Sequence, residues 1–372
     1  MKTLVYGAGP LGSYIAAKLH EDGVEVALLA RGQRLADLRE HGVVLEHWRS
    51  GARETHHVPV VEELGEDDLY DLVLVVMRKD QSRDVLPVLA KNQHAHTVLF
   101  LQNNPAGFAD YTATLGAGRV MAGFPSFGGE RLDPVMRVMP LPRMAMPIGE
   151  VDGRITDRTR EVAVLIERTG KAVEIRRDID AWLVTHIPAI MGYGGIFAAD
   201  LDPGRFARTR DAMLLGVRAR TEALRVQRMA GIPISPPSFR WLPFIPEPLV
   251  VALLWTLART TFFEVGVVSH SKVAREEIAL LVEEYRERIA PAGVATPVFD
   301  QLAAHVKGSV APLPDGSREQ PMRWGGFVGT VAGCFAAVAV ARLLRRRASS
   351  MPGCDVLPGR VPLRGTEAYL TL

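Results

Sequence analysis

Residues 4–12, Leu4-Val5-Tyr6-Gly7-Ala8-Gly9-Pro10-Leu11-Gly12, decide the fold. Three apolar residues precede glycines spaced G-x-G-x-x-G, residues 13–22 read as a helix, and residues 24–30 read as a second strand. In that context the glycines permit a tight turn, close approach of a pyrophosphate, and packing of the helix on the strand. A glycine turn joining any parallel strand to its helix is the alternative. The predicted cofactor contacts are Gly7, Ala8, Gly9, Pro10, Leu11 and Gly12.

Arginines follow the second predicted strand at the place where NAD-binding proteins usually carry an acid. Arg31 comes directly after the strand, and Arg34 lies one turn further on. A guanidinium suits the 2′-phosphate of NADP, whereas a carboxylate would repel it. The sequence therefore predicts NADP(H) rather than NAD(H) as the cofactor, bound by Arg31 and Arg34. Two solvated loop charges are the alternative.

The composition is that of a globular protein long enough for two domains. The chain has 372 residues, 48% of them hydrophobic and 23% charged, with a formal net charge of +2. That balance gives no electrostatic reason to expect nucleic-acid binding. Cys334 and Cys354 have no histidine pair near them in sequence, so no metal site is predicted. We expect reduced thiols and a cytoplasmic protein, because no signal sequence is evident at the N-terminus.

Alternating strands and helices in the first half predict an α/β fold with a Rossmann-type, doubly wound parallel sheet. We expect this NADP-binding domain over residues 1–177 and an all-helical substrate or dimerisation domain over residues 178–318. The proline-rich residues 231–248 read as a connection without regular structure. Charged residues of the helix predicted over 271–290 lie mostly opposite its apolar stripe, which is typical of a solvated face.

The end of the chain contains an apolar segment followed by arginines. Residues 324–341 carry no charge, and Arg342 and residues 345–347 are basic. This length is just enough to cross a bilayer. A crossing from a cytoplasmic body would nevertheless place the arginines outside, against the positive-inside rule. We therefore expect an apolar helix over residues 319–348 that packs on the body or a partner subunit, or lies at the inner face of the cytoplasmic membrane. A flexible tail is expected over residues 349–372.

These residues resemble the ketopantoate (2-dehydropantoate) 2-reductase family. The likeness is specific over about residues 1–105, which hold the glycine turn, Ala30-Arg31-Gly32-Gln33-Arg34-Leu35 and Leu101-Gln102-Asn103, and is looser to about residue 300. It implies an NADP-binding Rossmann domain, a helical C-terminal domain, and a small 2-keto acid in the cleft between them. It also implies that Arg78, Gln81 and Asn103 contact the cofactor, with Asn103 contacting the substrate too. Arg78 stands where the family has a lysine, and Lys79 is beside it.

The sequence departs from the family at its catalytic lysine. That lysine comes two residues after a tryptophan, and here Trp182-Leu183-Val184 places a valine there. Valine cannot donate a proton, and the family's later asparagine on this helix falls at Pro188. His186 is the nearest titratable side chain, so His186 and Asn103 are our candidate donors to a developing alkoxide. A histidine satisfied within an apolar helix is the alternative. Further along, Glu264 and His270 lie near the family's substrate-binding polar positions.

Two functions agree with the sequence. The first is an NADPH-dependent oxidoreductase that reduces a small carbonyl compound, a 2-keto acid or a ketone; without the family lysine, ketopantoate itself is a doubtful substrate. The second is a non-catalytic NADP(H)-binding sensor or regulatory protein on a reductase scaffold, with or without membrane attachment. Both are compatible with a homodimer.

Overall fold

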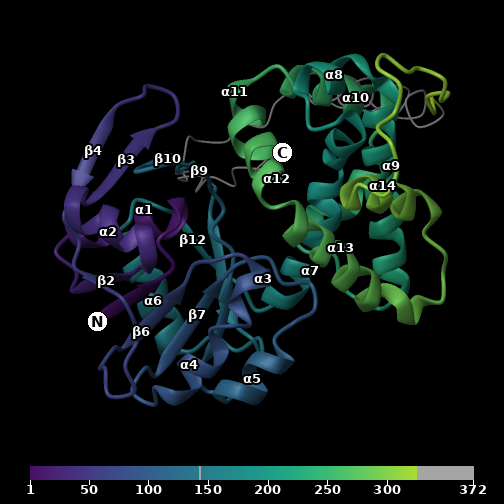
Figure 1. Ribbon diagram of the computed structural model, residues 1–372. Coiled ribbons are helices and arrows are strands. Elements are labelled where there is room, and N and C mark those ends of the chain that lie inside the picture. Colours follow the sequence, from purple (N-terminus) through teal and green to yellow (C-terminus); the bar gives the residue numbers. More distant parts are fainter. Residues whose placement is uncertain (142–143, 325–372) are drawn as a thin grey trace, which may run out of the picture.

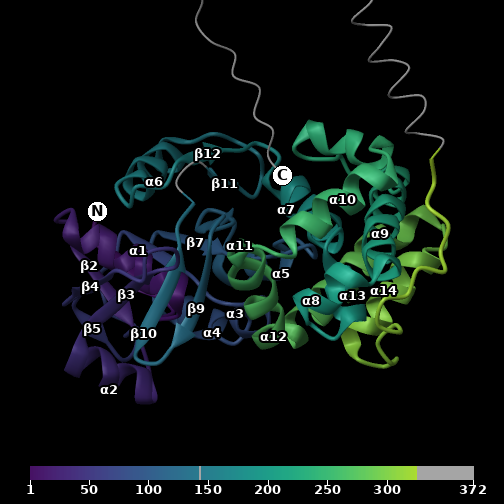
Figure 2. The same cartoon turned by 90° about the horizontal axis from the view of Figure 1, so that it is seen from above.

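The computed structural model describes residues 1–141 and 144–324 (Figure 1). The apolar segment and tail predicted beyond Trp324, and both cysteines, lie outside these residues. The N-terminal part forms one body of strands and helices, and the helices from α7 onward form a second body beside it (Figures 1 and 2). The two bodies meet at α3, α7 and α13.

An eight-stranded sheet forms the centre of the N-terminal body, and it confirms the predicted α/β fold. Its order is β12-β11-β8-β7-β6-β1-β2-β5, and within it only β11 runs antiparallel to its neighbour β8. The sheet therefore has the strand order of a doubly wound dinucleotide-binding fold, with β1 in the middle. The strands are β1 Thr3–Tyr6, β2 Val26–Leu29, β5 Val60–Val61, β6 Leu72–Val75, β7 Thr97–Leu101, β8 Val120–Gly123, β11 Met146–Glu150 and β12 Val173–Ile175.

Helices cover both faces of this sheet, as its continuous apolar strands require. Val5 and Leu74 face one core together with Ile15 of α1. Val73 and Phe100 face the other core. The helices of this body are α1 Pro10–Glu21, α2 Gly32–His41, α3 Lys79–Ser82, α4 Leu86–Lys91, α5 Ala109–Leu115 and α6 Asp157–Glu167.

A second, four-stranded sheet of order β4-β3-β10-β9 was not predicted from the sequence. Its strands are β3 Val43–His47, β4 Arg53–His56, β9 Gly128–Leu132 and β10 Val135–Met139. Many of its residues are polar and exposed, so the apolar periodicity that marks a strand is weak. The sheet packs against α1, and a Cβ on Gly129 would lie 2.6 Å from Cβ of Pro10. It therefore lies beside the glycine turn.

The C-terminal body is helical, as predicted. Its first helix, α7, ends at Met191, and the chain continues as the 3-10 helix η1, where Gly195 passes so close to α9 that a Cβ would lie 1.9 Å from the Ala212 carbonyl oxygen. Residues 231–248, predicted to be irregular, contain the 3-10 helix η2. The elements are α7 Ile179–Met191, η1 Gly194–Ala199, α8 Pro203–Arg208, α9 Arg210–Met229, η2 Pro237–Phe244, α10 Glu247–Leu257, α11 Thr261–Phe263, the π-helix η3 Glu264–Ser269, α12 His270–Val273, α13 Arg275–Ile289, η4 Ala290–Ala292 and α14 Pro297–Lys307.

One continuous helical segment among the described residues, Ile179–Ala199, is long and apolar enough to cross a membrane. It is 72% buried within the protein, which is the behaviour of a core helix. Leu183 packs against the sheet domain, and Val184 and Ile187 pack in the helical core. Helix α7 therefore packs against the hydrophobic cores of both domains.

Candidate active site

The glycine turn between β1 and α1 leaves open space over Gly9. Gly7 has a φ of +123°, and a Cβ there would lie 2.3 Å from the Val76 carbonyl oxygen. A Cβ on Gly12 would lie 1.9 Å from the Gly7 carbonyl oxygen, so α1 packs directly on the turn. Gly9 has no atom within 4 Å of its Cβ position, and α1 begins there with no side-chain cap and no acid in its first turn. The positive end of the helix therefore faces a space that suits an anion.

Arg31 lies at the carboxyl end of β2, beside this turn. Its guanidinium donates a hydrogen bond to the Tyr6 hydroxyl and lies 5.6 Å from the centre of that ring. Burial raises the pKa of Tyr6, although Arg31 opposes the shift, so the hydroxyl is neutral at physiological pH. Arg31 is exposed, and the first turn of α2 contains no acid. A neutral partner therefore orients the Arg31 guanidinium while leaving its charge available to a ligand.

Arg34 has a different environment from Arg31. It is buried, and it donates hydrogen bonds to the carbonyl oxygens of Ala8 at 3.2 Å and Pro134 at 3.1 Å, and to the Ser13 hydroxyl at 3.2 Å. These bonds tie the glycine turn to the loop between β9 and β10. The geometry of Arg34 is that of a residue that positions the turn, and the phosphate contact predicted for it stays a prediction.

The residues that follow β6 connect the two domains. Arg78 donates from Nη1 to the Val273 carbonyl oxygen at 2.7 Å, and its Nη2 pairs with Asp80 at 3.2 Å. Gln81 is exposed on the short helix α3. The structure thus places Arg78, predicted to contact the cofactor, in contact with α12 of the helical domain.

Lys79, next to Arg78, is fully buried in a polar network. Its ammonium group donates to the Asn104 side-chain oxygen, lies 3.4 Å from Glu284 Oε2, and sits 5.4 Å from the centre of the Tyr111 ring. Burial lowers the pKa of Lys79, an effect that Glu284 counters. Because its partners belong to both domains, Lys79 holds the domains together.

Glu277 and Glu284 correct the prediction that the charges of this helix form a solvated face. Glu277 is 3% exposed and accepts a hydrogen bond from the Lys79 backbone N–H at 3.0 Å. Burial raises its pKa to about 7. The two acids are seven residues apart, so they share one stripe of α13, which faces α3. That spacing, beside the buried Ile278 and Leu281, is the signal that sequence reasoning missed.

Asn103 follows β7 and carries an unsatisfied polar atom. Its side-chain oxygen is buried and has no hydrogen-bond partner among the residues that the structure describes. Strand β7 lies between β6 and β8, so Asn103 comes between the segments that begin with Val76 and Phe124 at the carboxyl edge of the sheet. A buried acceptor left without a partner is costly. A ligand that donates to this oxygen would remove that cost.

His186 lies on α7 in a cluster with two aromatic rings, Trp182 and Phe124, which also contact each other. It stacks on Trp182 with ring centres 5.1 Å apart, and its ring centre is 4.3 Å from that of Phe124. Burial lowers the pKa of His186 to about 4, and His270 contributes to the shift. His186 is therefore a neutral imidazole at pH 7, able to donate a hydrogen bond but not an imidazolium proton. Val184 is fully buried in the helical core.

His270 lies on α12 of the helical domain. Burial and the nearby Arg78 both lower the pKa of His270, and His270 in turn contributes to the lowered pKa of His186. Arg78 after β6, His186 on α7 and His270 on α12 thus influence one another electrostatically across the domain boundary. Glu264 is exposed at the start of η3. Within the described ranges, no group of three or more histidine, cysteine or acidic residues is arranged to hold a metal ion.

The fold and the turn geometry together define a Rossmann-type dinucleotide-binding domain joined to a helical domain. Residues 3–140 match the model of the family described as ketopantoate reductase PanE/ApbA, which confirms the resemblance seen in the sequence. The N-terminal part of this chain is therefore similar to the ketopantoate reductase family over residues 3–140. Over 99 residues the chain is 30% identical to the uncharacterized oxidoreductase YkpB of Bacillus subtilis (strain 168). That match spans 27% of this chain and 32%, about a third, of the relative.

Solved structures extend the likeness to both domains at the level of fold. D-mandelate dehydrogenase with NADH and anilino(oxo)acetate superposes with a TM-score of 0.67 and 18% identity, covering 83% of this chain and 97% of that one. The 2-dehydropantoate 2-reductase of Geobacter metallireducens GS-15 gives a TM-score of 0.66 at 18% identity, covering 83% of this chain and 100% of that one. At these identities the likeness establishes the shared fold.

Proposed function

We propose that the protein is an NADP(H)-dependent oxidoreductase that reduces a small carbonyl compound, a 2-keto acid or a ketone. The observation that carries the proposal is the pairing of an open glycine turn with the exposed guanidinium of Arg31. A turn of this shape suits a pyrophosphate, and a cation in place of an acid suits a 2′-phosphate. D-mandelate dehydrogenase is described with NADH, so a preference for NAD(H) is the competing outcome.

In this proposal the N-terminal domain holds the dinucleotide. Backbone amides around Gly9 and the N-terminus of α1 bind the pyrophosphate, Arg31 binds the 2′-phosphate, and Arg34 keeps the turn in place. When bound, the nicotinamide supplies the hydride. The buried side-chain oxygen of Asn103, which has no partner among the described residues, accepts a hydrogen bond from the cofactor or the substrate and orients it.

His186 stabilises the developing alkoxide as a neutral hydrogen-bond donor. Its pKa of about 4 excludes an imidazolium at neutral pH, so the proton that completes the alcohol comes from water. A preorganised neutral donor lowers the energy of an oxyanion without being a strong acid. The rings of Phe124 and Trp182, which pack against His186 and against each other, form an apolar surface suited to the hydrocarbon part of a substrate.

A non-catalytic NADP(H) sensor is the second candidate. One observation favours it specifically: the position of the family lysine is Val184, which is fully buried, and the nearby His186 is not protonated at neutral pH. Such a protein would bind NADPH and change conformation without oxidising it.

Two measurements distinguish these functions. NADPH binding is followed by its fluorescence, and oxidation is followed by its absorbance against a panel of 2-keto acids and ketones. Turnover of at least one carbonyl that His186→Ala abolishes, with NADPH affinity retained, supports the enzyme. Tight NADPH binding with no turnover on any compound supports the sensor. A failure to bind either nicotinamide dinucleotide would refute both.

A further inference from the structure

The helical domain carries a large exposed apolar face that the proposed function does not use. It is formed by η2 and α10, far from the glycine turn (Figures 1 and 2). Trp241 is 64% exposed and Phe244 63% exposed, which is unusual for side chains of this size. We call it the η2–α10 face, and its apolar members are Trp241, Phe244, Ile245, Leu249, Leu253 and Trp255.

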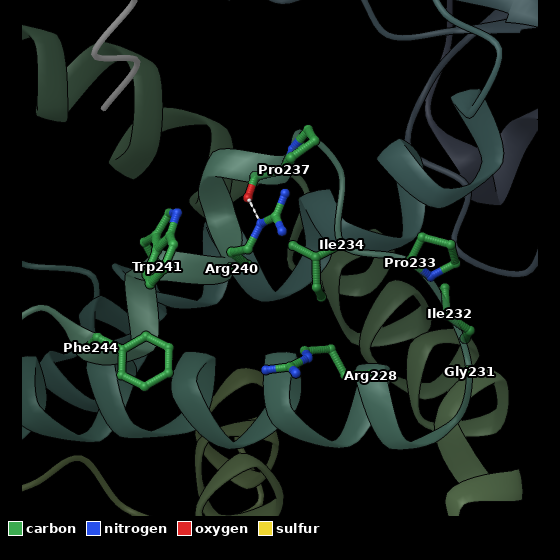
Figure 3. A pocket seen from close by; sticks show the side chains of 9 residues that line it. All are labelled: Arg228, Gly231, Ile232, Pro233, Ile234, Pro237, Arg240, Trp241 and Phe244. Carbon is green, nitrogen blue, oxygen red and sulfur yellow. Dashed lines mark hydrogen bonds between the residues drawn. The ribbon is translucent and has the colours of Figure 1, made fainter.

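A groove opens on this face between the end of α9 and η2 (Figure 3). Its volume is about 590 Å³, and most of its lining is apolar. Trp241 and Phe244 lie at one end with ring centres 6.0 Å apart, and Ile234 lies between them and the chain that leaves α9. Arg228 and Arg240 also line the groove, so it combines hydrocarbon surface with positive charge.

The charge on this part of the chain is strongly one-sided. Between Ala223 and Phe263 the only acid in the sequence is Glu247, which is buried. Its carboxylate accepts hydrogen bonds from Nε of Arg218 at 2.8 Å and from Nη2 of Arg218 at 2.9 Å. The same stretch exposes several arginines, although the whole chain is nearly neutral. Its exposed cations are Arg225, Arg228, Arg240 and Arg259.

Aromatic rings and arginines side by side are typical of surfaces at the boundary between lipid headgroups and acyl chains. Arg259 shows the arrangement directly, because its guanidinium carbon lies 3.5 Å from the centre of the exposed Trp255 ring. Tryptophan and phenylalanine can enter the headgroup layer while nearby arginines meet anionic phosphates.

The two helices that follow η2 differ in how much of their apolar surface is exposed. The helices Glu247–Leu257 and Thr261–Val273 together are apolar enough to span a bilayer, but they meet at 87°. Phe263, Val265 and Val268, in the second of them, are buried in the protein, although Val273 at its end is exposed. The first helix and η2 therefore expose most of the large apolar side chains of this region.

The described chain ends beside the same face. The Arg323 backbone N–H donates to Glu247 Oε2 at 2.8 Å at the start of α10, and Arg218 donates to the Pro321 carbonyl oxygen at 2.7 Å. The sequence continues from there with the apolar residues 325–341 and then the basic residues 345–347. Stable attachment usually needs two signals, and the sequence after Arg323 supplies a second apolar and basic stretch.

We propose that the η2–α10 face docks the protein on a bilayer that contains anionic lipids. A second copy of the chain is the competing occupant. A two-fold dimer through this face would set one arginine-rich surface against an identical one, with no exposed acid from the stretch between Ala223 and Phe263 to compensate. Anionic headgroups supply that compensation, so the charge pattern favours the bilayer.

The test uses the full-length protein and sedimentation with two kinds of vesicle, one of phosphatidylcholine alone and one that also contains phosphatidylglycerol. Trp241→Ser combined with Phe244→Ser should weaken binding to the anionic vesicles at least about tenfold. Arg228→Gln should weaken it about fivefold, and only on the anionic vesicles. The matched controls are Val164→Ser on α6, an exposed apolar residue of the other domain, and Arg39→Gln on α2.

Thermal unfolding and NADPH fluorescence of each variant separate loss of docking from misfolding and from failure of the proposed function. Docking of wild type and both controls, with loss in the η2–α10 variants, supports the proposal. Wild-type binding by those variants would overturn it, because the face would then contribute nothing beyond the C-terminal segment. Light scattering that shows a dimer which Trp241→Ser with Phe244→Ser dissociates would also overturn it, in favour of a second copy.

Discussion

Arg31→Asp should reverse the cofactor preference, because it changes an exposed charge beside the glycine turn from positive to negative. Arg31 has no acidic partner in the first turn of α2, and among the described residues its hydrogen bond is to the neutral Tyr6 hydroxyl. Losing a charge-assisted hydrogen bond to a phosphate costs about 1.5–3 kcal/mol. Since Arg31 is exposed and solvent screens its charge, we take the low end. The expected loss of NADPH affinity is about tenfold.

The assay is titration of NADPH and NADH by fluorescence or calorimetry at fixed ionic strength. Wild type should prefer NADPH, and Arg31→Asp should lose affinity for NADPH while keeping or gaining affinity for NADH. Arg34→Met is the informative control: it removes three hydrogen bonds that hold the glycine turn, so it should weaken both cofactors alike. Equal affinity of the wild type for the two cofactors, or an equal loss for both in Arg31→Asp, would refute the reasoning.

Four further predictions concern the domain boundary and the helical core. His186→Ala should lower kcat about 100-fold on any substrate found, with NADPH affinity unchanged; unaltered turnover would make His186 a packing residue. Burial lowers the pKa of His186 to about 4, so between about pH 4 and 6.5 the unfolded chain binds more protons at this group than the folded chain does. The contribution of His186 to the free energy of unfolding should therefore fall as the pH drops through that range. Acid unfolding of His186→Phe should lack this pH-dependent part. The pKa of Glu277 is raised to about 7, so its contribution to the free energy of unfolding falls as the pH rises from about 4.5 to 7. Glu277→Gln should raise the free energy of unfolding at pH 8 by up to about 3 kcal/mol and change it little at pH 4. An effect of this substitution that does not depend on pH would contradict the assignment. Nε and Nη2 of Arg220 have no hydrogen-bond partner among the described residues, and burial lowers the pKa of Arg220 to about 10. Arg220→Met should therefore raise the midpoint of thermal unfolding. A lower midpoint would show that the charge of Arg220 has a stabilising partner.

The parts of the fold that sequence predicts well are those fixed by local pattern. Residues 4–12 indicate the strand, the turn and the helix, because the glycines stand where a side chain would collide with backbone close by, as at Gly7 and Gly12. The second sheet could not be predicted in the same way. Strands β3 and β10 pair although they are far apart in sequence, and polar residues on β4 hide the alternation that would mark a strand.

The cofactor side of the site follows from the same local patterns, whereas the domain interface does not. Arg31 and Arg34 look equivalent in sequence, yet Arg31 is exposed and Arg34 is buried under the glycine turn. The difference arises because the second sheet brings the Pro134 carbonyl oxygen to Arg34 as a hydrogen-bond acceptor. Glu277 looks like one of many charges on an amphipathic helix. Its burial depends on where α13 meets α3, and that contact joins elements nearly two hundred residues apart.

The two cations that follow β6, Arg78 and Lys79, contact residues of the helical domain, so they hold the two domains together. Their interactions affect which side chains are available for the proposed chemistry. Arg78 bonds to Val273 of α12, and Lys79 is enclosed by Asn104 and Glu284. The remaining side chains at the domain boundary that our proposal uses, Asn103 and His186, are neutral at pH 7. In the proposed site, neutral donors stabilise an alkoxide by hydrogen bonds and supply no ammonium group to it. The proposed reductase must therefore depend more on orientation of cofactor and substrate than on acid strength, and its turnover should vary little between about pH 6 and 8 with respect to His186.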